Sequence, residues 1–256
     1  MSHGHDAAGP WLPSWRARAG AALRLFCFPY AGGDVAIFAP WAEDLPWEIE
    51  LCPVQLPGRG RRALEPAYAA LDPLVDALAA GLLPALDGRF AFFGHSMGAL
   101  VCFELARELR RRGGPLPCHL LVSGRPAPQL PRRYGPLSQL PDRELVEQLH
   151  RRYGYAPPHD DGQLDELLRL MIPTVRSDVA VSDTYVYPDE PPLACPITAF
   201  GGLDDPTVTR DELAAWGAQT AGRFEIRMLP GGHFYLESEW RFLVRFLATS
   251  LRSAIG

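Results

Sequence analysis

The alternation of short apolar runs with longer helical patterns constrains this chain more than any other feature of its sequence. Several of the apolar runs are continuous, as in strands that are covered on both faces. The predicted strands are residues 23–28, 49–54, 90–93, 119–123, 197–200 and 224–229, and the helices between them are 71–86, 97–112, 211–220 and 238–253. This order predicts an α/β fold with a central, mostly parallel sheet that has helices on both faces.

One stretch, from about residue 127 to residue 187, breaks the alternation. It contains two helical patterns, 142–153 and 164–185, where the alternation of strands and helices predicts another strand. We predict that it is an inserted helical cap, or lid, over the carboxyl ends of the strands, where open α/β folds bind ligands. Residues 1–22 are predicted to be an N-terminal tail, and residues 23–256 a single domain.

Composition excludes several classes of partner. A net charge of -5 provides no basic field for nucleic acid or for an anionic membrane. The five cysteines are scattered, lack a C-x-x-C spacing and mostly lie in apolar runs, which is typical of free thiols in a reducing compartment. The chain starts without a signal-peptide pattern, and no segment approaches the roughly 18 apolar residues that span a membrane. We expect a soluble, cytoplasmic protein.

The main chemical motif is Gly94-His95-Ser96-Met97-Gly98, which lies between a predicted strand and a predicted helix. A sharp turn from strand to helix exposes the serine oxygen, and glycines flank it because larger side chains would clash there. The amide of Met97, at the start of the helix, is predicted to donate to an oxyanion. Ser96 is therefore the candidate nucleophile.

A serine nucleophile needs a general base, and His233 is the candidate among seven histidines. It lies in a glycine-rich loop after the last predicted strand. His95 is next to Ser96, but adjacent side chains on the turn diverge, so we expect it to pack beside the strand. The remaining histidines fall in the tail, at a strand start or in the cap: His3, His5, His119, His150 and His159.

The acid that orients the imidazole should come from a loop at the same edge of the sheet. The loop after the fifth predicted strand offers Asp204 and Asp205. We choose Asp205, and Asp204 stays open as the alternative because adjacent carboxylates point in different directions. A second oxyanion donor is expected in the glycine-rich loop after the first strand. We assign it to the amide of Ala31, with Tyr30 as the alternative.

Taken together, these motifs resemble the type II thioesterases that accompany polyketide synthases and nonribosomal peptide synthetases. The resemblance runs from about Leu23 to the C-terminus. It rests on Leu25-Phe-Cys-Phe-Pro-Tyr-Ala-Gly-Gly33, Gln55-Leu-Pro-Gly-Arg-Gly60, the Ser96 motif, Leu170-Met-Ile-Pro-Thr-Val-Arg-Ser-Asp178, Cys195-Pro-Ile-Thr-Ala-Phe-Gly201 with Asp205, and Gly231-Gly-His-Phe234.

The resemblance implies the α/β-hydrolase fold and an editing enzyme that removes aberrant acyl groups from the phosphopantetheine arms of acyl or peptidyl carrier domains. It implies an acyl-serine intermediate on Ser96, and neither a metal nor a redox cofactor. We expect a monomer. Open alternatives are a product-releasing thioesterase, an acyl-CoA hydrolase, a carboxylesterase of the same fold, and a catalytically silent protein that binds carrier domains.

Two sets of residues are candidates for contact with the substrate. Docking of an acidic carrier would need local arginine patches, although each arginine is also explained as solvated charge. The docking candidates are Arg59, Arg61, Arg62, Arg132, Arg133, Arg151 and Arg152. Four apolar cap residues are candidates for an acyl channel or for helix core: Leu167, Leu170, Met171 and Val175.

Overall fold

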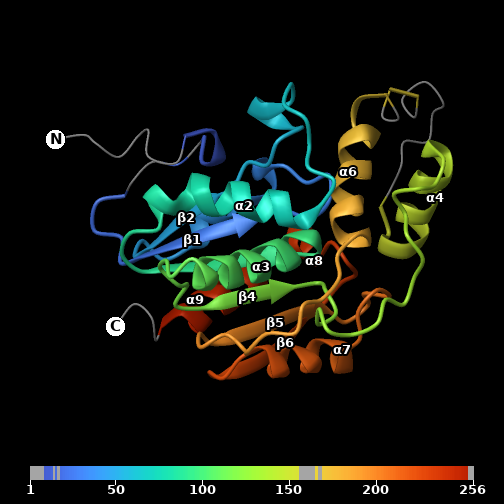
Figure 1. Cartoon of the computed structure of the whole chain (residues 1–256). Coiled ribbons are helices and arrows are strands. Elements are labelled where there is room, and N and C mark those ends of the chain that lie inside the picture. Colours follow the sequence, from blue (N-terminus) through green and yellow to red (C-terminus); the bar gives the residue numbers. More distant parts are fainter. Residues whose placement is uncertain (1–8, 14, 16–17, 156–164, 167–168, 253–256) are drawn as a thin grey trace.

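Six parallel strands form one sheet through the middle of the molecule (Figure 1). The computed structural model describes residues 9–13, 15, 18–155, 165–166 and 169–252. In these residues the strand order is β2-β1-β3-β4-β5-β6, and every pairing is parallel. The strands are β1 (Leu23–Phe28), β2 (Ile49–Pro53), β3 (Phe90–His95), β4 (Leu120–Ser123), β5 (Ile197–Gly202) and β6 (Phe224–Leu229). The predicted fold class is confirmed.

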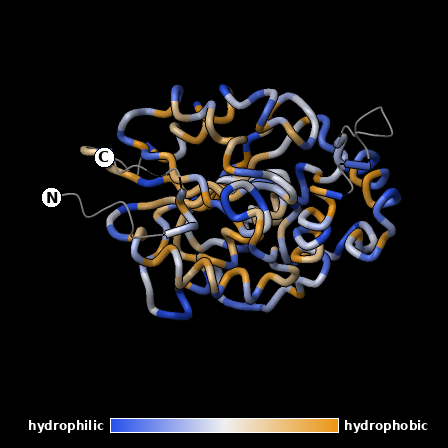
Figure 2. The backbone as a smooth tube through the Cα atoms, turned by 90° about the horizontal axis from the view of Figure 1, so that it is seen from above, coloured by the Kyte–Doolittle hydropathy of each residue, from blue (hydrophilic) through white to orange (hydrophobic). Residues whose placement is uncertain are grey.

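The sheet separates two apolar cores, because successive side chains of a strand point to opposite faces. From β1, Phe26 and Phe28 enter one core, and Leu25 and Cys27 enter the other. Helices α2 (Leu71–Leu82) and α3 (Met97–Arg111) pack on the first face. The opposite core contains α1 (Trp41–Asp44) and α9 (Trp240–Leu251). Figure 2 shows hydrophobic and hydrophilic segments interleaved along the backbone.

Differences from the predicted helices are confined to their ends. Pro84 cannot donate a backbone hydrogen bond, and α2 passes into a 3-10 helix at Leu83–Ala85. The predicted helix 211–220 is α7 (Arg210–Ala214) followed by a second 3-10 helix, Ala215–Gln219. A separate turn of helix, α8 (Tyr235–Ser238), precedes α9. Within the described residues, no helix is long and apolar enough to cross a membrane.

The stretch between β4 and β5 contains α4 (Asp142–Tyr153) and α6 (Ile172–Asp183), which stand beyond the carboxyl ends of the strands (Figure 1). Helix α4 has the predicted bounds. Helix α6 is shorter than the predicted 164–185, and part of that range lies outside the described residues. The cap is therefore placed over the edge of the sheet where the Ser96 motif lies.

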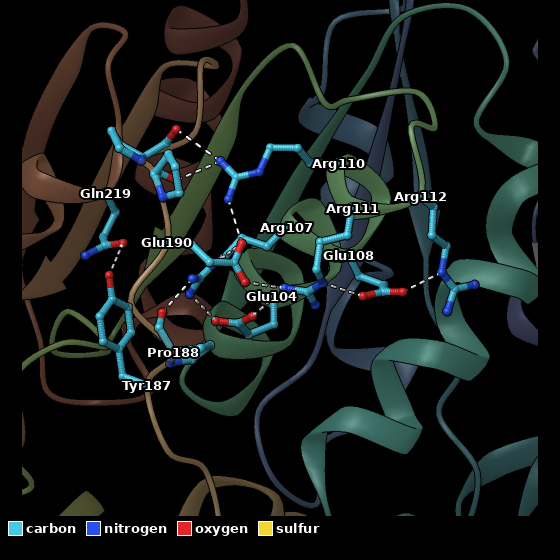
Figure 3. Close-up of polar contacts among 12 residues, drawn as sticks. Glu104, Arg107, Glu108, Arg110, Arg111, Arg112, Tyr187, Pro188, Glu190 and Gln219 are labelled. Atoms are coloured by element: carbon cyan, nitrogen blue, oxygen red, sulfur yellow. Dashed lines mark hydrogen bonds and ion pairs between the residues drawn. The ribbon is translucent and has the colours of Figure 1, made fainter.

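The chain returns from α6 to β5 alongside α3, where arginines and carboxylates form a cluster (Figure 3). Arg107 pairs with Glu104 at 2.8 Å and donates to the carbonyl of Pro188 at 2.6 Å. Arg110 and Arg111 pair with Glu190 on the returning segment, each at 2.7 Å. The remaining residues labelled in Figure 3 are Glu108, Arg112, Tyr187 and Gln219. The arginine run that ends α3 therefore also holds the returning segment in place.

The N-terminal segment differs from the predicted tail over residues 9–12. Gly9–Trp11 forms a 3-10 helix, and Trp11 and Leu12 belong to the core. Trp11 lies over Gly81 of α2, where an added Cβ would be 2.1 Å from the indole nitrogen. The space that the Trp11 indole occupies depends on Gly81, which lies 70 positions further along the chain. The sequence around Trp11 therefore did not predict that this residue is buried.

The five cysteines are free thiols. Cys27, Cys52 and Cys102 are buried, and Cys118 and Cys195 are half-buried. Burial raises the pKa of the Cys27, Cys52 and Cys102 thiols well above the ordinary value. They are therefore uncharged and unreactive at neutral pH.

Candidate active site

Ser96 occupies a strained turn between β3 and α3. Its φ is 55° and its ψ is -112°, and it is the only non-glycine residue with a positive φ in the part of the chain that the structure describes. A Cβ on Gly94 would lie 2.1 Å from the carbonyl oxygen of Gly98, and one on Gly98 would lie 2.2 Å from that of Phe28. Both glycines are therefore needed for this turn, and strain of this kind is characteristic of functional sites.

His233 and Asp205 are brought together from two loops at the same edge of the sheet. His233 Nδ1 lies 2.8 Å from Asp205 Oδ2, and both side chains are buried. An ionised carboxylate only accepts hydrogen bonds, so Nδ1 carries the proton and Nε2 has a free lone pair. Asp204, the open alternative, is exposed and directs its backbone N–H to Gly231. The structure thus places Asp205, and not Asp204, against the imidazole.

Thr207 completes the surroundings of Asp205 and was not predicted. Its backbone N–H and its hydroxyl donate to Asp205 Oδ1 at 2.8 and 2.6 Å. Burial raises the pKa of Asp205, but the hydrogen bond and charge of His233, together with Thr207, outweigh burial and lower the pKa below its usual value. Asp205 therefore remains ionised beside the imidazole. The signal for Thr207 was its position two residues after an aspartate, a spacing that favours such turns.

His95 packs beneath the site, as predicted. Its ring centroid is 5.0 Å from that of His233, and its Nδ1 is 2.8 Å from Ser123 Oγ, which in turn bonds to the hydroxyl of Tyr235. Complete burial, and then repulsion from His233, lower the pKa of His95 well below its ordinary value. His95 is therefore a neutral packing residue.

Two of the other histidines are described by the structure, and both bond to residues that are not part of the proposed triad. His119 precedes β4 and bonds to Thr198, and His150 bonds to the carbonyl of Tyr155 at the end of α4. His3, His5 and His159 lie outside the described residues.

The loop after β1 brings backbone amides to the site. Ala31 and Met97, the two predicted oxyanion donors, line the same hollow as Ser96, and so does Tyr30. The neighbouring amides are engaged within the protein: Gly32 N–H donates to Asp178 at 2.7 Å, and Gly33 N–H to the carbonyl of Tyr30 at 2.9 Å. Ala31 therefore borders the hollow together with Tyr30 and Gly32, and the Gly32 amide is already engaged within the protein.

A buried ion pair holds this loop to the cap. Arg59 makes two hydrogen bonds to Asp178 of α6, at 2.5 and 2.7 Å, and both side chains are less than 10% exposed. The same carboxylate accepts the Gly32 N–H. The prediction that Arg59 docks a partner is therefore wrong, since its buried guanidinium is already bonded to Asp178 inside the protein. Asp178 ends one of the motifs that carry the resemblance, but its link to Arg59 was not predicted, because the two residues are 119 positions apart.

The docking prediction is wrong for Arg62 as well. Arg62 is only 7% exposed, pairs with Glu65 at 2.6 Å and stacks over the ring of Trp11 at 4.1 Å. Arg61, between these two arginines, is exposed. Arg59, the arginine of the motif from Gln55 to Gly60, therefore has a structural role.

Two hollows meet at Ser96. The apolar hollow has a volume of about 180 Å³ and is lined by Met171 and Val175, two of the four candidates for an acyl channel or for helix core. Leu170 is instead 61% exposed, and Leu167 lies outside the described residues. The second hollow, which we call the arginine groove, has a volume of about 470 Å³ and is lined by Arg125, Arg132, Arg133 and Arg152 among others. Ser96 is reachable from both.

The arrangement has the parts that acyl transfer requires. It combines a hydroxyl on a strained turn, an imidazole held by a carboxylate, and the residues Ala31 and Met97, which line the same hollow as the hydroxyl. In the described part of the chain, no three His, Cys, Asp or Glu side chains gather in a way that could hold a metal ion.

Comparisons with known proteins agree on one family. A family model described as a thioesterase domain matches residues 23–251. The chain is 40% identical over 246 residues to the gramicidin S biosynthesis protein GrsT of Aneurinibacillus migulanus, covering 96% of this chain and 95% of that one. It is 42% identical to linear gramicidin dehydrogenase LgrE of Brevibacillus parabrevis, over 99% and 97% of the two chains, although that name describes another reaction.

Solved structures give the same result. The RedJ thioesterase from the prodiginine pathway of Streptomyces coelicolor superimposes with a TM-score of 0.82 at 40% identity, covering 93% of this chain and 92% of that one. The type II thioesterase BorB from the borrelidin cluster also has a TM-score of 0.82, at 38% identity, with 93% and 98% covered.

Proposed function

This chain belongs to the thioesterase family, among the type II enzymes of polyketide and nonribosomal peptide pathways, and we propose that it removes acyl groups from the phosphopantetheine arms of carrier domains. The proposal includes a Ser-His-Asp triad of Ser96, His233 and Asp205. Removal of aberrant acyl groups would allow a stalled assembly line to restart. The enzyme would act in the cytoplasm as a monomer.

One observation carries the proposal: Ser96 lies where two hollows of different character meet, with the His233–Asp205 pair beside it. His233 lines the apolar hollow together with Ser96. A thioester on a carrier arm has an apolar acyl group on one side of its carbonyl and a long polar arm on the other. Two hollows that open from a single serine suit such a substrate better than one closed pocket would.

The geometry supports a two-step mechanism. Ser96 Oγ attacks the thioester carbonyl while His233 Nε2 takes its proton, and Asp205 stabilises the imidazolium that forms. The amides of Met97 and Ala31 donate to the oxyanion. The C–S bond then breaks, the arm leaves as a thiol with a proton from His233, and an acyl-serine remains. Water, deprotonated by His233, attacks this ester and releases the carboxylic acid.

The acyl group is assigned to the apolar hollow. Its lining includes Leu137, Met171, Ile172 and Val175, all from the cap, so the cap supplies much of the surface that would contact the acyl chain. A volume of about 180 Å³ suits short or medium acyl groups better than an elaborate finished product. This observation favours editing over product release.

The experiment compares hydrolysis of acetyl, propionyl and longer acyl groups on a phosphopantetheinylated carrier protein, on CoA and on p-nitrophenol. Wild type is expected to prefer the carrier-bound thioester, and Ser96→Ala to lose activity by at least about 10³-fold. Ser177→Ala is the matched control, because Ser177 is half-buried on α6, donates its hydroxyl to the carbonyl of Pro173 and lines neither hollow.

Each rival predicts a different outcome. Preference for the oxygen ester would indicate a carboxylesterase, and equal rates on CoA and carrier would indicate an acyl-CoA hydrolase. Full biological effect of Ser96→Ala would favour a silent carrier-binding protein.

A further inference from the structure

The arginine groove is positive although the chain as a whole has a net charge of -5. Four arginines line it, against two carboxylates, Asp183 and Glu212. The apolar hollow has only Arg125 and Asp183 as formal charges. A surplus of cations in one hollow of an acidic protein attracts an anionic part of the substrate to that side of Ser96.

Two of the arginines, Arg132 and Arg133, lie at the exposed end of the groove. Their side chains are 43% and 38% exposed. Arg132 donates to the carbonyl of Tyr185 at 2.7 Å, and Arg133 pairs with Glu212 at 2.7 Å. A guanidinium has five N–H donors, so each keeps donors for a ligand while these contacts hold its side chain in place.

At the inner end of the groove, Arg125 borders both hollows together with Ser96. Burial lowers its pKa to about 10, so it is still charged at neutral pH. Arg125 is half-buried, its guanidinium donates to Ser182 Oγ at 3.1 Å, and the charge of Asp183 acts on it without a hydrogen bond between the two among the described residues. A half-buried guanidinium whose hydrogen-bond partner is a neutral hydroxyl keeps N–H donors for a strong acceptor of the substrate at this position.

We propose that the arginine groove binds the phosphopantetheine arm, with Arg132 and Arg133 on its phosphodiester and Arg125 on the amide carbonyl nearest the thioester. This inference rests on the proposed function, and it assigns the part of the substrate that binds in the arginine groove. The arm has one anionic end, neutral amides along its length and the thioester at the other end, so a thioester at Ser96 directs the phosphate away from Ser96, toward the exposed arginines. Arginine is suited to the phosphate because it binds two oxygens at once.

The order of contacts can be tested with acetyl thioesters that differ by one group. Acetyl-pantetheine has the amides without the phosphate, acetyl-phosphopantetheine adds the phosphate, and acetyl-CoA and the acetylated carrier distinguish the two natural sources of the arm. The measured quantity is the ratio of kcat/KM for acetyl-phosphopantetheine to that for acetyl-pantetheine. Because both kcat/KM values are measured on the same enzyme preparation, their ratio is unaffected by any general loss of folded enzyme.

In the double variant Arg132→Gln/Arg133→Gln, this ratio is expected to fall by about tenfold or more, as expected for the loss of charge-assisted hydrogen bonds. The same ratio in wild type should decline with added salt, because salt screens the exposed arginines. Arg245→Gln is the charge-matched control. Arg245 is exposed on α9 and lines neither hollow, so its substitution should leave the ratio unchanged.

Arg125→Gln should behave differently, because its partner amide is present in both substrates. The kcat/KM values for both are expected to fall by about tenfold, with the ratio unchanged. A loss limited to acetyl-phosphopantetheine would overturn the inner assignment, since Arg125 would then contact the phosphate.

The outcomes separate this inference from the proposed function. If wild type prefers the phosphorylated substrate and the double variant keeps that preference, the groove assignment is overturned while the thioesterase proposal stands. If wild type shows no preference for the phosphate, the groove assignment is overturned as well. Absence of thioester hydrolysis by wild type would overturn the proposed function, and this inference with it.

Discussion

Two buried arginine–carboxylate pairs hold the cap region of this protein, and they differ in what else they touch. Arg59 and Asp178 join α6 to the loop after β1, and Asp178 also accepts the Gly32 N–H next to the proposed oxyanion donor. Arg107 and Glu104 lie on α3 and hold the segment that returns to β5 (Figure 3). The first pair is part of the surroundings of the site, whereas the second lines neither hollow and reaches the arginine groove through Tyr185, whose hydroxyl donates to Glu104 at 2.8 Å. Equal burial therefore does not mean equal function.

The largest expected effect is on stability, and here the two pairs should differ. Asp178→Asn leaves the buried Arg59 without its carboxylate partner, so it should lower the free energy of unfolding by about 3 kcal/mol in urea denaturation. Glu104→Gln should cost less, because Arg107 keeps Glu190 at 3.4 Å and because burial already raises the pKa of Glu104. Asp165→Asn is the control, because Asp165 pairs with Arg143 at the surface and should change little. An equal loss of stability in the two buried variants would contradict this difference.

Turnover should separate the two pairs. Asp178→Asn frees the Gly32 turn and misplaces the Ala31 amide, so kcat should fall by roughly 10²-fold, the cost of losing an oxyanion donor. Glu104→Gln should keep the wild-type kcat at a temperature where both variants are folded. Affinity for an alkyl boronic acid, which mimics the tetrahedral intermediate on Ser96, should fall in parallel with kcat. An unchanged boronate affinity in Asp178→Asn would show that Asp178 acts only on stability.

Replacing each pair by apolar residues sharpens the comparison further. Arg107→Met/Glu104→Leu and Arg59→Met/Asp178→Leu remove both charges together, so each double variant should recover most of the stability lost in the single variants. Only the first should also have the wild-type kcat, because a leucine side chain in place of Asp178 has no oxygen to accept the Gly32 N–H. Recovery of kcat by the second double variant would contradict a positioning role for Asp178.

The smallest expected effect concerns how the stability of the protein depends on pH. Glu104 and Asp205, the carboxylate of the proposed triad, should change this dependence in opposite directions. Burial raises the pKa of Glu104 above its ordinary value despite the opposing effect of Arg107, so the folded state holds this proton more tightly than the unfolded state does. Relative to Glu104→Gln, wild type should gain stability as the pH falls toward about 4.5. Unfolding measured from pH 7 to about pH 4.5 tests this.

Asp205 has the opposite sign, because its folded pKa is lowered. Its stabilising contribution is present above the unfolded pKa of about 3.9 and is lost as the pH falls through the folded pKa. Relative to Asp205→Asn, wild type should therefore lose stability in acid below about pH 4. If the stability difference between wild type and variant changed with pH in the same direction for both carboxylates, their pKa values would not be shifted in opposite directions.

Much of the fold followed from local pattern. Strands β1 and β6 have the predicted bounds, and β3 and β5 extend two residues beyond them into glycine-containing turns. Continuous apolar runs specify buried parallel strands whatever their partners are, because both faces of each strand must be covered. The position of Trp11 could not be predicted, because a glycine on α2 creates the space for it.

The candidate site divides in the same way. The turn at Ser96 is a local feature, set by two glycines between a strand and a helix, and could be read from five residues. The choice between Asp204 and Asp205 could not, because it depends on the direction in which a loop presents two adjacent carboxylates. Arg59 looked like a surface charge until Asp178, far along the chain, was seen to face it.

The sequence by itself determined the α/β architecture, the strained serine and the loops that supply its partners, since all three depend on residues that are neighbours in the chain. Only the tertiary structure decided which carboxylate meets His233, that Asp178 holds the Gly32 turn, and that two hollows of opposite character meet at Ser96. The physical reason is that hydrogen bonds and buried charges act over a few ångströms in space. Their partners are selected by how distant segments pack, and local pattern does not record that packing.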